Sequence, residues 1–109
     1  MSIDAIGYVR SDVSRTHQKA DEERLRAHAK CHGYNLKKTI VFGSHIDDPE
    51  HRLGAVLDRM DGVEAVIVPT VQHFDGDQVP DAISSRVDVV VVAPQTKLAR
   101  LAQLARVSR

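Results

Sequence analysis

Two short runs of almost entirely aliphatic residues, 63–68 and 87–93, constrain the fold of this chain more than any other feature. The second run reads VDVVVVA and is the strongest strand signal in the sequence. β-Branched residues favour strands, and a strand without polar alternation is typical of a parallel sheet covered on both faces. Two further strands are predicted, at residues 3–10 and 35–42. Only 4% of the residues are aromatic and none is Trp, so the core must be aliphatic.

Helical segments are predicted between the strands. The first helix is expected to begin at Ser14 as its N-cap and to stop at Gly33. Asp48 followed by Pro49 is typical of the start of a second helix, with Asp as the cap and Pro in the first turn. The apolar face of this second helix consists of Leu53, Val56, Leu57 and Met60.

Two further helices are predicted, a short one at 80–85 and a basic amphipathic one at 96–109. The predicted elements therefore alternate strand and helix throughout. Alternation with short connections implies right-handed crossovers and a parallel sheet. The predicted fold class is therefore α/β, an open parallel sheet of about four strands with helices on both faces and a flavodoxin-like topology. Ligands of such sheets bind beyond the carboxyl ends of the strands. Here those ends are residues 10–14, 43–48, 69–77 and 94–95.

The chain of 109 residues fits one domain, and its formal net charge of zero hides an asymmetry. Residues 1–94 carry 11 basic and 15 acidic side chains, whereas residues 95–109 carry four basic and no acidic ones. A neutral chain does not coat nucleic acid by charge alone. The basic end could contact phosphate or the acidic body of another copy, although a solvated helix face is the simpler interpretation.

One cysteine, Cys31, cannot form a disulfide within the chain, which fits a reducing compartment. No stretch of the sequence is typical of a signal peptide or of a membrane-spanning helix. We therefore expect a cytoplasmic protein without a membrane partner.

Four short motifs occur together at the spacing of a known family. They are GYVR at the end of the first predicted strand, Gln18 in the first helix, Gly33-Tyr34 after it, and HRLGAVLDRM before the third strand. Together they resemble the catalytic domain of the serine recombinases (the resolvases and invertases) over residues 3–95. The resemblance implies a resolvase-like α/β domain over residues 1–95, with residues 96–109 as a C-terminal helix of the same domain.

Members of this family cleave DNA with a serine two residues after an arginine of the first strand, and further arginines surround the scissile phosphate. A serine hydroxyl must be activated to act as a nucleophile, and guanidinium groups offset the charge of the phosphoryl transition state. Arg10 matches the arginine of the first strand, but Asp12 stands at the position of the nucleophile. Ser11 lies one place early and Ser14 two places late. In an extended strand Ser11 would point to the wrong face, unless the strand has ended.

The other positions of the family's site differ as well. Arg52 matches a second arginine that binds phosphate. After the third strand the family carries Asp-Arg-Leu-x-x-Arg. This chain has Gln72 in place of the acid, His73 in place of the arginine, and Gly76 or Asp77 in place of the second arginine. An added carboxylate would repel a phosphate.

We therefore predict a degenerate site without a catalytic residue, whose remnants are Arg10, Ser11, Asp12, Ser14, Arg52, Gln72 and His73. The predicted function is that of a regulatory or structural module that acts through binding, as a homodimer, with DNA as a further candidate partner. One alternative is an active recombinase that uses Ser11 or Ser14 as a shifted nucleophile. Another is a small anion-binding module that uses Arg10 and Arg52.

Two clusters could hold a metal ion but have simpler interpretations. One comprises His45, Asp47, Asp48 and His51, whose spacing matches no zinc signature. In the other, His28 and His32 share a helix face beside Cys31, which permits a redox or metal site. Surface histidines and a partly buried thiol are the simpler interpretation of this second cluster.

His73 could also act as a general base beside Asp75, although the Asp-Gly pair that follows is typical of a turn. The sequence contains neither of the glycine-rich motifs that bind nucleotides or dinucleotides. No metal, cofactor or nucleotide is therefore predicted.

Overall fold

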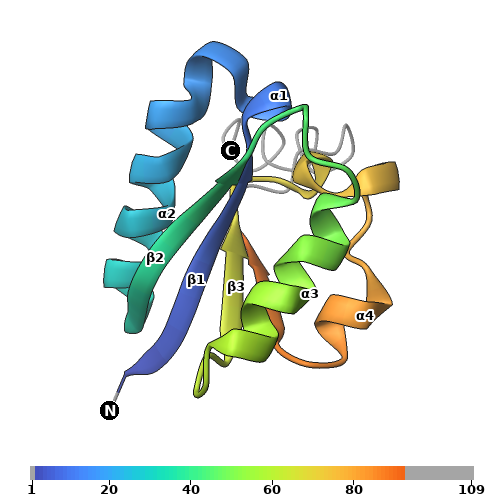
Figure 1. The fold of residues 1–109 in the computed structure, drawn as a ribbon. Coiled ribbons are helices and arrows are strands. Elements are labelled where there is room, and N and C mark those ends of the chain that lie inside the picture. Colours follow the sequence, from blue (N-terminus) through green and yellow to red (C-terminus); the bar gives the residue numbers. More distant parts are fainter. Residues whose placement is uncertain (1, 93–109) are drawn as a thin grey trace, which may run out of the picture.

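The structure is a computed structural model that describes residues 2–92, in which strands and helices alternate (Figure 1). Four strands form one parallel sheet in the order β2-β1-β3-β4. They are β1 (Ile3–Arg10), β2 (Tyr34–Phe42), β3 (Ala65–Val68) and β4 (Asp88–Val91). The predicted α/β class and the four-stranded parallel sheet are confirmed. The helix predicted over residues 96–109 lies outside the described residues.

Helices cover both faces of the sheet, with α2 on one face and α3 and α4 on the other (Figure 1). The helices are α1 (Ser11–Ser14), α2 (Gln18–His32), α3 (Pro49–Arg59) and α4 (Asp81–Ser84). Three single 3-10 turns complete the described chain, namely η1 (Arg15–His17), η2 (Val71–His73) and η3 (Asp75–Asp77). The predicted loop at 69–77 therefore contains two of these turns.

Alternation along β1 divides the core between the two faces, because neighbouring side chains of a strand point in opposite directions. Toward α3 and α4, the buried cluster consists of Ile6, Tyr8, Leu53, Leu57, Val66, Val68, Phe74 and Ile83. Toward α2, it consists of Ala5, Val9, Leu25, Ala29, Ala65 and Ile67. Every residue of β3 is buried, as the aliphatic run predicts for a strand covered on both faces.

Gly7 lets α2 lie close to β1. A Cβ atom at this position would lie 2.8 Å from Leu25 Cδ1 of α2 and 2.8 Å from Thr39 Oγ1 of β2. Such contacts are too short for any side chain, so the absence of one at Gly7 sets the distance at which the helix packs.

The predicted helix ends are confirmed at two positions. Gly33 has φ of 77° and ends α2 in the left-handed conformation that glycine adopts without strain. Asp48 caps α3, since its carboxylate accepts a hydrogen bond of 3.2 Å from the backbone N–H of His51, and Pro49 occupies the first turn.

The predicted start of the first helix is wrong. Ser14 closes the short helix α1 and is not the N-cap of a longer one, and α2 begins only at Gln18. The chain breaks between them because Arg15 takes φ of 53°, outside the helical region. The Ser14 oxygen accepts no capping hydrogen bond from a backbone N–H, and its hydroxyl instead donates to the carboxylate of Asp21.

Candidate functional site

The strand order places a topological switch point between β1 and β3, because the chain passes from β1 to β2 on one side and enters β3 on the other. Ligands of open α/β sheets bind in the crevice outside the carboxyl ends of the strands at such a point. A pocket of about 270 Å³ lies there. It is lined by Val13, Ser14, His17, Ala20, Asp21, Arg24, Thr70, Gln72 and His73. A wider pocket of about 650 Å³ shares Ser14 and Gln72 with it and reaches Asp12 and Asp77.

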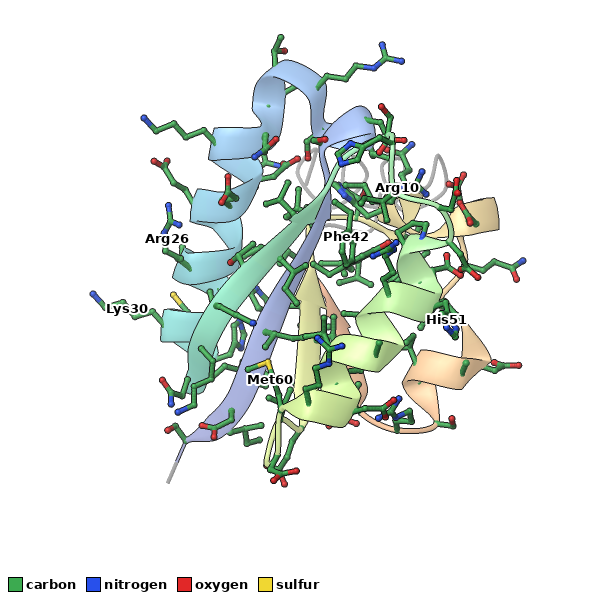
Figure 2. All side chains as sticks on the ribbon, viewed as in Figure 1. Arg10, Arg26, Lys30, Phe42, His51 and Met60 are labelled. Carbon is green, nitrogen blue, oxygen red and sulfur yellow. The ribbon has the colours of Figure 1, made fainter. Side chains whose placement is uncertain are left out.

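The guanidinium of Arg10 is bound by two carboxylates. Arg10 lies at this end of the sheet, where it pairs with Phe42 across β1 and β2; Figure 2 labels both residues. Arg10 Nε and Nη2 donate to Asp12 Oδ1 and Oδ2 at 3.3 and 2.9 Å, and Nη1 donates to Asp75 Oδ1 at 2.8 Å. Burial opposes the charge of Arg10, but these hydrogen bonds outweigh that effect and raise its pKa. An incoming anion would have to displace both carboxylates.

A third acidic side chain supports this arrangement from α3. Glu50 Oε2 accepts a hydrogen bond of 2.6 Å from the backbone N–H of Asp75. Asp12 and Asp75 thus bind Arg10 and Glu50 holds Asp75, and the combined charge of these three side chains disfavours a phosphate at this place. Arg52 lies exposed on α3, two residues beyond Glu50, and its guanidinium forms no hydrogen bond or ion pair with residues 2–92.

His73 is buried, with 1% of its surface exposed, and the contacts of its ring determine which nitrogen carries the proton. Nδ1 accepts a hydrogen bond of 2.8 Å from the backbone N–H of Arg10, so the proton of the neutral ring lies on Nε2. Nε2 faces the pocket, 4.0 Å from Asp21 Oδ2. Burial lowers the pKa of His73, although the nearby Asp21 acts in the opposite direction.

The structure has the turn expected after His73, as η3, and it does not realise the alternative that pairs His73 with Asp75. Asp75 is bound to Arg10, whereas the carboxylate that faces His73 belongs to Asp21, in the first turn of α2. Asp75 points elsewhere because the backbone between the two residues extends at Phe74, with φ of −104° and ψ of 148°.

The two candidate serines are bound in different ways. Ser14 is 4% exposed, and its hydroxyl donates to Asp21 Oδ2 at 2.5 Å. Ser11 begins α1, because β1 has ended, and its hydroxyl donates to the carbonyl oxygen of Phe42 at 3.4 Å. Within residues 2–92, neither hydroxyl forms a hydrogen bond with a guanidinium or an imidazole.

The predicted site residues thus fall into two groups. Arg10 and Asp12 form one group with Asp75 and Glu50. Ser14 and His73 form the other group with Asp21 at the pocket. Gln72 is exposed on the wall of that pocket. Sequence reasoning missed the roles of Asp21 and Glu50, since acidic residues in the first turn of a helix are ordinary there. The only feature of the sequence that could have indicated these roles is the position of both residues near helix starts that follow the strand ends.

Of the two metal candidates of the sequence, residues 45–51 follow β2 at the same end of the sheet as Arg10, whereas His28 and His32 lie in the last two turns of α2. Asp48 acts as a helix cap, and residues 2–92 contain no cluster of three or more metal-ligating side chains. The rings of His28 and His32 stack on α2, and Cys31 is exposed rather than partly buried, as the last turn of the helix leaves it in solvent. No helix within the described range is long and apolar enough to span a membrane.

No protein-family model matches the sequence, and no curated protein matches it significantly. Among solved structures, the fold is similar to the crystal structure of the C-terminal catalytic domain of ISC1926 TnpA, an IS607-like serine recombinase, with a TM-score of 0.66. The sequences are 17% identical, and the match covers 96% of this chain and 78% of that one. At this identity the likeness concerns the fold, which is that of a serine recombinase catalytic domain.

Proposed function

We propose that this chain is a non-catalytic, resolvase-like domain that acts through binding. In this proposal it serves as a regulatory or structural module, a cytoplasmic homodimer related by descent to DNA recombination, with residues 96–109 as part of the same domain. DNA is a candidate partner because the fold is similar to that of a recombinase domain.

One observation carries the proposal, namely the two carboxylates that hold Arg10. Asp12, which the sequence resemblance aligns with the family's nucleophile, binds Arg10 with both oxygens. A bidentate arginine–carboxylate pair is a strong, oriented contact that leaves few donors for another anion. The same residue therefore removes the attacking group and occupies the group that would hold the phosphate.

A phosphate titration tests this occupancy. In the double variant Asp12→Asn/Asp75→Asn the Arg10 guanidinium is no longer neutralised, so we expect inorganic phosphate to raise the melting temperature of the variant in a saturable way. The wild-type protein should show no such rise. The measurement is a thermal unfolding series from zero to tens of millimolar phosphate at constant ionic strength.

Asp58→Asn is the matched control for this titration, because Asp58 is also paired with an arginine, Arg86, on another part of the surface. Its response to phosphate should equal that of the wild type. A wild-type response as large as that of the double variant would contradict the proposal and favour the anion-binding alternative.

The second candidate function is DNA cleavage by a shifted serine. The observation that favours it is the position of Ser14, which lines a pocket together with His73 and Arg24. We expect no covalent product when the full chain is incubated with supercoiled plasmid and nicked duplexes and then denatured. A covalent protein–DNA band that disappears in Ser14→Ala would establish cleavage instead, with Ser11→Ala as the control for the other hydroxyl.

A further inference from the structure

His28 and His32 lie one turn apart in the last two turns of α2. Since α2 runs antiparallel to the strands, its C-terminal end lies where the strands begin, at the opposite end of the sheet from the pocket (Figure 1). The two rings stack with their centroids 4.2 Å apart and their planes at 29°. We propose that the pair binds one divalent transition-metal ion of the Zn²⁺ or Ni²⁺ class, through one ring nitrogen of each histidine.

The geometry of the helix brings the two ligands within reach. Residues four apart on a helix are neighbours on its surface. Two ring nitrogens on one metal ion lie about 3 Å apart, because each N–metal bond is about 2.0–2.1 Å. Rings that already touch reach this arrangement by rotation of the two side chains, without a change in the backbone.

The chemistry of the pair selects the class of ion. Imidazole nitrogen suits Zn²⁺, Ni²⁺ and Cu²⁺, whereas Mg²⁺ and Ca²⁺ prefer oxygen ligands. Only a neutral ring binds a metal ion.

The neighbouring side chains leave the pair accessible. His32 is exposed and His28 is half-buried. Arg24 lies one turn earlier, and its guanidinium is 4.0 Å from the carboxylate of Asp21 at the pocket. Because residues 2–92 contain no cluster of three metal-ligating groups, Cys31 is not part of the site and water completes the coordination.

Calorimetric titration of the untagged full-length chain tests this site, with ZnCl₂ and NiCl₂ as the added salts. We expect saturable binding of one ion per chain. His28→Ala and His32→Ala should each weaken binding at least about tenfold, since each removes a direct ligand. A second readout is amide hydrogen exchange, which zinc should slow in the last turn of α2 in the wild type but in neither variant, because only the helix holds the two rings together.

Three controls make the assignment specific. His51→Ala removes another exposed histidine, on α3, and Cys31→Ser removes the adjacent thiol. Both should bind zinc as the wild type does, and MgCl₂ should give no saturable signal. The proposal is overturned if zinc and nickel do not bind, if either single histidine variant retains full affinity, or if Cys31→Ser abolishes binding. The pocket at the strand ends plays no part in this test.

Discussion

The neutral ring of His73 connects the end of β1 to the turn that follows β3. Its Nδ1 atom accepts a hydrogen bond from the backbone N–H of Arg10, which a protonated ring cannot do. Protonation would also charge a side chain that is almost fully buried. The end of β1, and with it the position of Arg10, therefore depends on the protonation state of one imidazole.

This dependence predicts a loss of stability in mild acid. The pKa of His73 is lowered in the folded state, so below the ordinary histidine pKa of about 6.5 the unfolded chain binds a proton that the folded chain does not. The free energy of unfolding should therefore fall as pH decreases from about 6.5 toward the lowered pKa. Above about pH 6.5, His73 should add nothing to the pH dependence of that free energy.

Urea unfolding between pH 5 and 8 measures this effect. His73→Gln, which cannot take up a proton, should show a weaker dependence on pH than the wild type. His51→Ala serves as the control, because His51 is exposed and its loss should leave the profile unchanged. A profile for His73→Gln that parallels the wild type would exclude the role assigned to this ring.

The residues of the site could be predicted from the sequence only in part. The position of Asp12, two residues after Arg10, is visible in the printed sequence. The partners of Arg10 and His73 are not, because Asp75 and Asp21 resemble other surface acids until the fold places them. The partner of a carboxylate can be identified only from the distances between its oxygens and the surrounding donors.

At the scale of the element, β1 and α2 are held together by close packing over Gly7. A methyl group there would meet Leu25 and Thr39 at 2.8 Å. Gly7→Ala should therefore destabilise the protein by about 1–3 kcal/mol, the usual cost of overpacking a core. Denaturant unfolding followed by far-UV circular dichroism measures the change.

Gly54→Ala is the matched control in α3. A Cβ atom at Gly54 would have only an ordinary contact of 3.6 Å with Arg86 Nη1, and alanine favours the helix by up to about 1 kcal/mol. This variant should be as stable as the wild type or more stable. Equal effects of the two substitutions would show that packing over Gly7 is not the cause.

Most elements follow from local sequence signals. The bounds of β1 match the prediction, and Gly33 and Asp48 act at the helix ends as expected. Ser14 misled because its type suits an N-cap, whereas the turn at Arg15 decides where α2 begins. The capping propensity of Ser14 did not decide the helix start there, because the chain forms α1 directly after β1 and then breaks at Arg15.

At the scale of the whole molecule, the distribution of charge supplies one candidate force for the proposed homodimer. The acidic body over residues 1–94 and the basic end over residues 95–109 carry opposite net charges, so the end of one copy can pair with the body of another. We expect sedimentation equilibrium to give the mass of two chains at low salt. Dissociation should increase at 0.5 M NaCl, where exposed charges are screened.

Two results would count against this form of association. A single-chain mass at low salt and about 100 µM protein would contradict the homodimer. A dimer that does not respond to salt would exclude charge pairing as the force that holds it, since exposed ion pairs weaken when the ionic strength rises.

By itself, the sequence determined the alternation of strands and helices and the α/β class, because aliphatic runs, caps and glycine stops act within a few residues. It also determined that an aspartate, Asp12, follows Arg10 by two residues. Only the tertiary structure decided that Arg10 is bound by carboxylates and that Nε2 of His73 faces the pocket. The physical reason is distance along the chain, because the contacts of Arg10 with His73 and Asp75 join residues 63 and 65 positions apart.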